Sequence, residues 1–248
     1  YNIAAIQTLK QIEAEGRQAR PDEQEILSRY VGWGGIPQAF DEENTQWSEE
    51  YRQLKELLTE KEYDAARSST LNAHYTSPTV IRAMYDAIEK MGFRTGNVLE
   101  PSCGVGNFFG MLPDDMSSSR LYGVELDSIT GRIARQLYPD ARITISGFEK
   151  TQRRDFFDLA IGNVPFGGYK VSDKQFDKYN FLIHDYFFAK TLEQVRPGGV
   201  IAYITSKGTM DKASPDVRKY ITQRAELLGA IRLPNTAFAA VSYTHLTL

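Results

Sequence analysis

The regular alternation of short apolar strands with helical segments after residue 72 constrains the fold more than any other feature of the sequence. Strands are predicted at NVLE (97–100), LYGVEL (121–126), RITIS (142–146), FDLAIGN (157–163), GGVIAYIT (198–205) and LLGAIRL (227–233), and helices at 77–91, 128–138, 180–195 and 216–225. Strands spaced by helices form mostly parallel sheets with helices on both faces. The sequence therefore predicts a doubly wound α/β domain, with ligand sites at the carboxyl ends of the strands.

The first 70 residues depart from this pattern and predict a separate helical lobe. Apolar side chains follow one helical stripe at Ile3, Ile6, Leu9 and Ile12. Pro21 starts a second helix, and Thr59 with Glu62 fits a capping box. Between these helices, the glycine-rich stretch YVGWGGIPQAF contains Trp33. It is interpreted as a loop anchored by one buried tryptophan, with a docking surface as the alternative.

Composition excludes several kinds of chemistry. The 248 residues include one cysteine and three histidines, so neither a disulfide framework nor a zinc cluster is expected, and no metal site is predicted. The sequence has no apolar run of membrane-spanning length and no leader-like start, which favours a cytoplasmic protein without a membrane partner. A net charge of -3 argues against a general polyanion binder, so any nucleic-acid contact must be local.

A glycine-rich turn follows the strand at 97–100. Gly104 and Gly106 let the backbone approach a ligand closely, and free amides at the start of a helix favour an anionic group. No complete GxGxxG pattern is present, so a smaller nucleoside with a carboxylate fits better than a dinucleotide. Glu125 and Asp127 end the next strand, where an acid can accept hydrogen bonds from both ribose hydroxyls.

Three motifs, in this order, resemble those of amino-methylating DNA methyltransferases. NAHYTSP (72–78) resembles the motif that precedes their cofactor loop, LEPSCGVGNF (99–108) resembles the cofactor loop itself, and GNVPFG (162–167) resembles their catalytic (Asn/Asp/Ser)-Pro-Pro-aromatic motif. Further stretches, among them YVGWGG, GVELDSITGRIA and RPGGVIAYITSKGTMDK, resemble the methylase region of helicase-fused (SNF2/DEAD-like) proteins of plasmids, conjugative elements and phages. The resemblance covers nearly all of residues 1–240.

This resemblance implies a Rossmann-like class I methyltransferase domain over 71–240, after the helical lobe of 1–70, with S-adenosylmethionine as cofactor. The residues implied to bind it are Tyr75, Thr76, Glu100, Pro101, Ser102, Cys103, Gly104, Gly106, Asn107, Phe108, Glu125, Leu126, Phe148, Glu149 and Asn163. Glu125 would hold the ribose, and Leu126, Phe148 and Glu149 would border the adenine, with a solvated loop acid as the alternative for Glu149. Cys103 is expected to be a packing residue, not a nucleophile.

The NVPF turn is predicted to hold the group that is methylated. An exocyclic amine on a base is a poor nucleophile because its lone pair is delocalised into the ring. Asn163 Oδ1 and the Val164 carbonyl would accept its two N–H groups and localise that pair, while Pro165 stiffens the turn and Phe166 stacks on the base. The motif's usual first proline is Val164 here, which keeps the carbonyl and loses some rigidity.

The implied partner is DNA, single- or double-stranded, methylated on the adenine N6 amine or, second, on the cytosine N4 amine. Lys170, Lys174 and Lys178 follow the motif and would contact phosphates or form a solvated face. RNA or protein-amide methylation and a noncatalytic nucleic-acid-binding module are the alternatives. A helicase region is expected in the same parent polypeptide, residues 241–248 are expected to be a non-native tail in place of a final strand, and the oligomeric state stays open.

Overall fold

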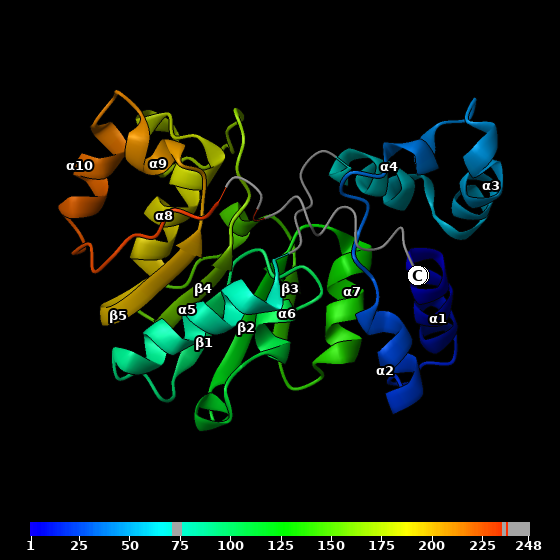
Figure 1. Ribbon diagram of the computed structural model, residues 1–248, viewed down its shortest axis with the longest axis horizontal. Coiled ribbons are helices and arrows are strands. Elements are labelled where there is room, and N and C mark those ends of the chain that lie inside the picture. The colour runs from blue at the N-terminus through cyan, green and yellow to red at the C-terminus, as the bar shows by residue number, and fades with distance from the viewer. Residues whose placement is uncertain (71–75, 235–236, 238–248) are drawn as a thin grey trace.

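The computed structural model describes residues 1–70, 76–234 and 237. Its centre is a five-stranded sheet in the order β3-β2-β1-β4-β5, with all four neighbouring pairs parallel (Figure 1). The strands are β1 Asn97–Glu100, β2 Arg120–Glu125, β3 Arg142–Ile145, β4 Phe157–Asn163 and β5 Val195–Ile204. The helices of this domain are α5 Pro78–Lys90, α6 Asn107–Gly110, α7 Ser128–Leu137, α8 Ile183–Gln194, α9 Gly208–Asp211 and α10 Asp216–Thr222, with short 3-10 turns at Asp114–Met116, Phe148–Lys150 and Asp177–Tyr179. The expected α/β fold with a parallel, doubly wound sheet is confirmed.

Alternate side chains of the central strands face opposite helices. Val98 of β1 packs in one cluster with Ile81 and Ile88 of α5, whereas the next residue, Leu99, packs in another cluster with Tyr186 of α8. Successive side chains of a strand point to opposite faces, so a strand covered on both sides reads as a continuous apolar run. This explains why NVLE and FDLAIGN lack the polar and apolar alternation of a half-exposed strand.

The first 70 residues form a helical lobe. Its helices are α1 Asn2–Ala14, α2 Pro21–Ser28, α3 Ser48–Leu57 and α4 Glu60–Ser69, with 3-10 turns at Pro37–Phe40 and Thr45–Trp47. The Thr59 and Glu62 side chains form the capping box at the start of α4, and Pro21 opens α2. Trp33 is buried and meets Phe40 edge-on, with ring centroids 5.1 Å apart, so it anchors the glycine-rich loop.

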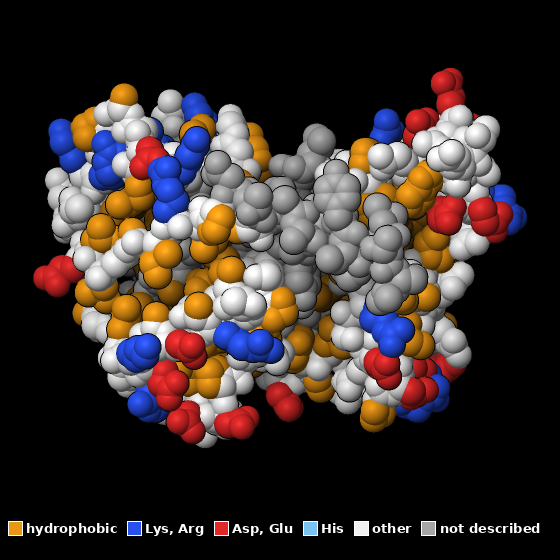
Figure 2. Space-filling view, in the orientation of Figure 1, with side chains coloured by type: hydrophobic (Ala, Val, Ile, Leu, Met, Phe, Trp, Pro, Cys, Tyr) orange, Lys and Arg blue, Asp and Glu red, His pale blue; other side chains and the backbone are white. Residues whose placement is uncertain are grey.

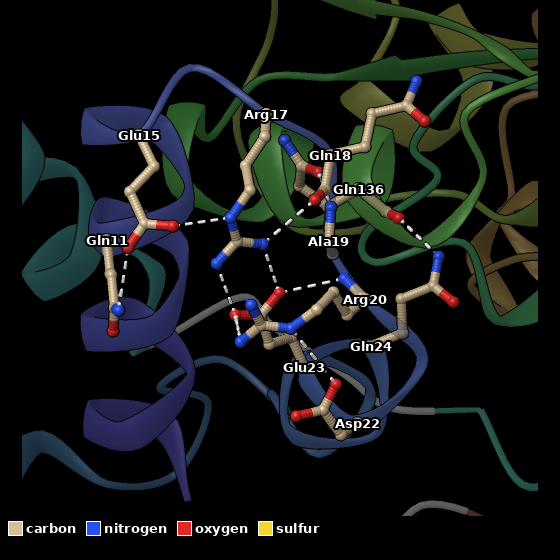
Figure 3. A network of polar contacts seen from close by, with 10 residues as sticks. All are labelled: Gln11, Glu15, Arg17, Gln18, Ala19, Arg20, Asp22, Glu23, Gln24 and Gln136. Carbon is tan, nitrogen blue, oxygen red and sulfur yellow. Dashed lines mark hydrogen bonds and ion pairs between the residues drawn. The ribbon is translucent and has the colours of Figure 1, made fainter.

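The segment between α1 and α2 joins this lobe to α7 of the sheet domain. Arg17 and Glu23 brace the segment through two hydrogen bonds of 2.5 and 2.7 Å (Figure 3). Gln136 of α7 then accepts hydrogen bonds from the Ala19 N–H and from the Gln24 side chain.

A second set of contacts strengthens the same junction. Arg132 of α7 forms ion pairs with both Glu13 and Glu62 of the lobe. The apolar core of the lobe also includes three residues of the sheet domain, Val105, Ile129 and Ile133. The lobe and the sheet domain thus share part of one core.

Four predicted elements differ from the structure by three residues or more. The strand expected at 198–205 begins three residues earlier, as β5 Val195–Ile204. The helix expected at 180–195 begins at Ile183 because Asn180 has a left-handed φ of +57°, and the helix expected at 216–225 ends at Thr222. The prediction of a strand at 227–233 is wrong, since this segment is irregular and Leu228 and Ile231 are largely exposed. A strand requires hydrogen bonds to a neighbouring strand, and within the described ranges this segment pairs neither with the edge strand β5 nor with any other strand. Tyr75 and the tail at 241–248 lie outside the described residues.

Candidate functional site

The candidate site lies where the carboxyl ends of β1, β2 and β4 meet (Figure 1). The strand register sets Glu100 at the end of β1 opposite Gly123 of β2, and Asn163 ends β4. The segments that follow these strands are the glycine turn at 101–106, the Leu126 and Asp127 turn, and the NVPF turn. The topology thus brings the cofactor-loop motif, the acidic strand end and the NVPF motif to one sheet edge.

The glycine turn is built from backbone conformations that favour glycine. Gly104 has a φ of +56° and Gly106 a φ of +90°, and Gly106 directly precedes α6. The Cys103 N–H donates to the Val124 carbonyl at 2.9 Å, which ties the turn to β2. A Cβ atom at Gly104 would meet no atom of the described residues within 4 Å, whereas one at Gly106 would lie 2.5 Å from the Tyr138 ring. Among the described residues, Gly104 therefore leaves room for a ligand and Gly106 does not.

Glu125 holds this turn in place through its carboxylate. Its Oε2 accepts a hydrogen bond of 2.9 Å from the Gly104 N–H, and its Oε1 accepts one of 2.8 Å from the Asp127 N–H. Burial, and to a smaller extent the charge of Asp127, raises the pKa of Glu125 to about 7, although these backbone hydrogen bonds act in the opposite direction. A carboxylate at this place suits the expected hydrogen bonds with ribose hydroxyls.

Several buried oxygen atoms of the site lack a hydrogen-bond partner among the described residues. They are Glu100 Oε2, Asp127 Oδ1 and Asn163 Oδ1. Glu100 is only 2% exposed, and burial, followed by the charge of Glu125, raises its pKa well above the ordinary value. A buried polar atom without a partner is costly, and such atoms mark places where a ligand or water completes the hydrogen bonding. The donor-rich ribose and amino groups of S-adenosylmethionine fit this set of acceptors.

Asn163 is fixed by its neighbours in a way that leaves its side-chain oxygen available. Its backbone carbonyl accepts a hydrogen bond of 2.8 Å from Ser102 Oγ, and its Nδ2 donates to Thr76 Oγ1 at 3.2 Å. The Val164 N–H donates to the Ile204 carbonyl at 3.1 Å, and the Val164 side chain is buried. The amide nitrogen thus points toward Thr76, and among the described residues nothing pairs with the oxygen. This is the arrangement needed to accept a hydrogen bond from a substrate amine.

The rest of the turn is more exposed. Pro165 and Phe166 are half-buried, and Lys170, Lys174 and Lys178 are exposed. Lys170 donates to the Asn180 side chain at 2.5 Å, and Lys178 lies 4.9 Å from the Tyr179 ring centroid. These surface contacts leave the lysines able to turn toward a polyanion.

On the predicted adenine side, the three residues differ. Leu126 is 77% exposed, which is unusual for leucine and leaves an apolar face for a planar ring. The Phe148 ring, by contrast, is buried and stacks on Phe187 of α8 with centroids 4.8 Å apart, so it anchors the Phe148–Lys150 turn to that helix. Glu149 is half-buried, and its carboxylate folds back over Gly147.

The remaining residues that were predicted to bind the cofactor pack in the core or begin a helix. Cys103 is buried beside Phe109, Ala134 and Ile143, and burial raises the pKa of its thiol well above the usual value, which makes it a poor nucleophile. Pro101 is buried, Asn107 begins α6 and Phe108 packs against Tyr85. Within the described ranges no group of three His, Cys, Asp or Glu side chains could hold a metal ion, and no helix there is long and apolar enough to cross a membrane.

The two glycines of the turn allow a matched test of the cofactor site. Gly104→Ala should destabilise the protein by only about 1–2 kcal/mol, the cost of a left-handed alanine, yet weaken S-adenosylmethionine binding at least about tenfold. Gly106→Ala should cost more stability, about 3 kcal/mol, because its Cβ overlaps the Tyr138 ring. Denaturant unfolding and calorimetry separate the effects. Unchanged affinity in a folded Gly104→Ala protein would place the cofactor elsewhere.

The chain is similar to several known proteins over different parts of its length. No family model matches the chain. The chain is 27% identical over 246 residues, 96% of its length, to the defense against restriction protein B of Escherichia phage P1. It is 35% identical to the type II methyltransferase M.CvrRI of Paramecium bursaria Chlorella virus XZ-6E over 79 residues, which cover 32% of this chain. It is 24% identical to the modification methylase CviBIII of Paramecium bursaria Chlorella virus NC1A over 151 residues, which cover 58% of this chain. It spans 9%, 21% and 40% of these relatives, respectively.

Two solved structures share the architecture. One is a Listeria monocytogenes protein assigned as a class I S-adenosylmethionine-dependent methyltransferase, with a TM-score of 0.56, 18% identity, and coverage of 95% of this chain and 75% of that one. The other is a modification subunit assigned to a type I restriction enzyme of Vibrio vulnificus, with a TM-score of 0.50, 19% identity, and coverage of 71% and 43%. The chain therefore has the Rossmann-like fold of class I S-adenosylmethionine-dependent methyltransferases.

Proposed function

We propose that this chain is an S-adenosylmethionine-dependent methyltransferase that methylates an exocyclic base amine in DNA, with adenine N6 as the first candidate. The observation that carries the proposal is the buried Asn163 Oδ1 at the end of β4, next to the glycine turn and without a partner among the described residues. An amide oxygen held in this way is suited to accept one N–H of an amine, and it has no evident role in stabilising the fold.

The proposed mechanism depends on positioning. When bound, S-adenosylmethionine supplies an electrophilic methyl group on a sulfonium and leaves as a neutral thioether, so no strong base is needed. Asn163 Oδ1 and the Val164 carbonyl accept hydrogen bonds from the two amine N–H groups and localise the nitrogen lone pair. The amine nitrogen then bonds the methyl carbon, and one of its protons leaves to water after the transfer. Ser102 and Thr76 hold the Asn163 backbone and amide nitrogen, which fixes the direction of the acceptor. Aligning reactants in this way accounts for a large part of enzymatic rate enhancement.

Reaching a base inside a duplex requires additional binding energy. Extruding a base costs about a few kcal/mol, and a stack on Phe166 returns roughly 1–3 kcal/mol, so other contacts must supply the difference. An uneven distribution of charge would favour contacts with DNA phosphates on one part of the protein. Residues 1–70 contain 14 acidic and 8 basic residues, whereas residues 166–224 contain 6 acidic and 10 basic residues. Figure 2 shows Lys and Arg side chains gathered over the α8 to α10 end. We place the DNA strand there and not over the helical lobe.

The names of the relatives support a DNA substrate. One is a modification methylase, one a type II methyltransferase and one a phage protein of defense against restriction. The chain spans only a small part of each of these proteins. The DNA-methylating activity of this chain is therefore our proposal. A helicase region in the same polypeptide is likewise a proposal. A bacterial or phage-encoded protein that methylates DNA would work in the cytoplasm of the host.

The proposal is tested by transfer of labelled methyl groups to duplex DNA, single-stranded DNA and RNA, followed by nucleoside analysis. N6-methyladenine in DNA is the expected product. If N4-methylcytosine is found, the mechanism stands and the base is cytosine. If only RNA is modified, the substrate is RNA and not DNA. Cofactor binding without any modified nucleoside would contradict a nucleic-acid methyltransferase and favour a noncatalytic module.

The three lysines after the motif provide a separate test of DNA contact. Changing Lys170, Lys174 and Lys178 together to glutamine should weaken DNA binding and reduce the dependence of log K on log salt concentration by up to about 3 units, since each phosphate contact releases counterions. Fluorescence anisotropy over a salt series measures both. Lys55 and Lys61 of the acidic lobe and Lys90 at the end of α5, which are all exposed, provide the control triple variant, which should bind DNA like the unaltered protein. Equal weakening in both triple variants would contradict the placement of the strand.

A further inference from the structure

Lys190 is a buried lysine that links two loops of the candidate site. It lies on α8, is 6% exposed and projects from a helix whose neighbouring side chains are mostly apolar. Its Nζ donates to Asp173 Oδ2 at 2.9 Å and to the Glu149 backbone carbonyl at 3.0 Å. Lysine is rarely buried unless it is paired, because the charged amine loses its hydration. Both of its acceptors come from connecting segments, Glu149 from the one between β3 and β4 and Asp173 from the one after β4.

The Asp173 end belongs to the loop after the NVPF turn. Its Oδ1 accepts a hydrogen bond of 3.1 Å from the Gln175 N–H, and its backbone carbonyl accepts from the Phe176 and Asp177 N–H groups, both at 2.8 Å. The Asp177 side chain accepts in turn from the Asp173 N–H. Asp173 therefore organises the segment 173–180, which carries Lys174 and Lys178.

The Glu149 end belongs to the 3-10 turn Phe148–Lys150, the turn predicted to border the cofactor's adenine. Lys190 also lies 5.8 Å from the centroid of the Phe148 ring, a cation–π distance. A single ammonium group thus holds the adenine-side turn and the DNA-side loop at fixed positions relative to each other. No other described side chain hydrogen-bonds to both.

We propose that Lys190 is a positioning residue that couples the two ligand sites, so that cofactor binding at the Phe148–Lys150 turn stabilises the 173–180 loop for the DNA strand. This proposal rests on the proposed function for its two ligands. If ordering one loop restricts the other through the shared ammonium, occupation of either site favours the other, and the coupling is reciprocal. Lys190 acts through Asp173 and the Glu149 carbonyl and contacts neither ligand itself.

Amide hydrogen exchange tests the first half of the coupling without DNA. The N–H groups of Asp173, Gln175, Phe176, Asp177 and Tyr179 are hydrogen-bonded within the loop, so their exchange reports its opening. Saturating S-adenosylhomocysteine should slow this exchange about tenfold in the unaltered protein. In Lys190→Met the slowing should be lost at 173–179 and retained at the glycine turn. Equal slowing in both proteins, or none at this loop in the unaltered protein, would overturn the coupling.

A matched variant separates coupling from loop stability. Tyr186 also donates to Asp173 Oδ2, at 2.8 Å, but makes no hydrogen bond to the Glu149 turn. Tyr186→Phe should therefore speed loop exchange in the free protein and keep the cofactor-induced slowing. If Tyr186→Phe abolishes that slowing as fully as Lys190→Met, a general loosening of the loop is responsible and the proposal fails. Should Lys190→Met not fold, Lys190→Gln, which keeps a polar group but has a shorter side chain, tests the same bridge with Asp173 intact and should also lose the slowing.

The second half is measured by the affinity for S-adenosylhomocysteine with and without a DNA duplex. The duplex should tighten binding about tenfold in the unaltered protein and by less than about twofold in Lys190→Met. Methyl transfer by the unaltered protein together with full coupling in Lys190→Met would reject only the role of Lys190. Absence of protection at the glycine turn would instead show that the cofactor does not bind, and would reject the proposed function.

Discussion

Asn163→Ala is expected to lower the rate of methyl transfer to DNA by about 10²–10³-fold, comparable to the loss of one preorganised hydrogen-bonding group in other active sites. The side-chain oxygen is buried and has no partner among the described residues, so its removal takes away an acceptor that was already aimed and desolvated. The Ser102 hydrogen bond goes to the backbone carbonyl, so the turn itself should persist. Single-turnover transfer of labelled methyl groups gives the rate, and calorimetry gives the cofactor affinity.

Asn163→Asp is the matched control for this change. It retains an oxygen at the same place, and its second oxygen can accept from the Thr76 hydroxyl that now receives Nδ2. We expect it to keep at least about a tenth of the activity of the unaltered protein, because the aimed acceptor is preserved. Full activity of Asn163→Ala would reject the proposed role, because the mechanism offers no other side-chain acceptor at the end of β4.

Glu125→Gln is expected to weaken S-adenosylmethionine binding by about 10–100-fold, since hydrogen bonds to charged groups contribute about 1.5–3 kcal/mol. Both carboxylate oxygens accept backbone N–H groups, and a glutamine side chain must turn its own NH₂ toward one of these donors. The substitution therefore disturbs the glycine turn as well as the ribose acceptor. Asp140→Asn, which changes an exposed acid just past the end of α7, should leave the affinity unchanged.

Glu125 should also make the affinity for S-adenosylmethionine depend on pH, because its pKa is about 7 in the free protein. Ribose hydroxyls donate to the ionised carboxylate, so the affinity should rise as pH increases to about 7, by at most about tenfold per unit, and be flat above. For folding the sign is reversed: the raised pKa contributes stability that is present below about pH 4.5 and lost as pH rises through about 7. A pH-independent affinity, or one that Glu125→Gln leaves pH-dependent, would contradict this role.

Features determined by local sequence were the ones that could be predicted. The Thr59 capping box, the start of α5 at residues 77 and 78 and the glycine turn directly before a helix each follow from the chemistry of a few adjacent residues. Order along the chain then placed the motifs at one sheet edge, because consecutive parallel strands end on the same side. The proximity of Asn163 to the glycine turn was predictable for that reason.

Features that depend on long-range partners could not be predicted. The apolar segment 227–233 has strand composition, but pairing requires an edge that no local pattern specifies. Phe148 was expected beside the adenine, and only the path of α8 shows that its ring stacks on Phe187. The sequence shows Lys190 as the one Lys or Arg within the mostly apolar helix α8, which is a sign of a special role. Its partners could not be predicted, because Asp173 and the Glu149 carbonyl are 17 and 41 residues away in sequence.

The shared core between the lobe and α7 has a practical consequence for how the protein can be divided. Val105 lies between Gly104 and Gly106 of the glycine turn, and its side chain is buried with the apolar residues of α1 and α2. Cutting the chain at residue 70 would expose Val105, Ile129 and Ile133 to water. The glycine turn thus packs on the helical lobe, and we expect that a fragment which keeps this turn in place has to include the lobe.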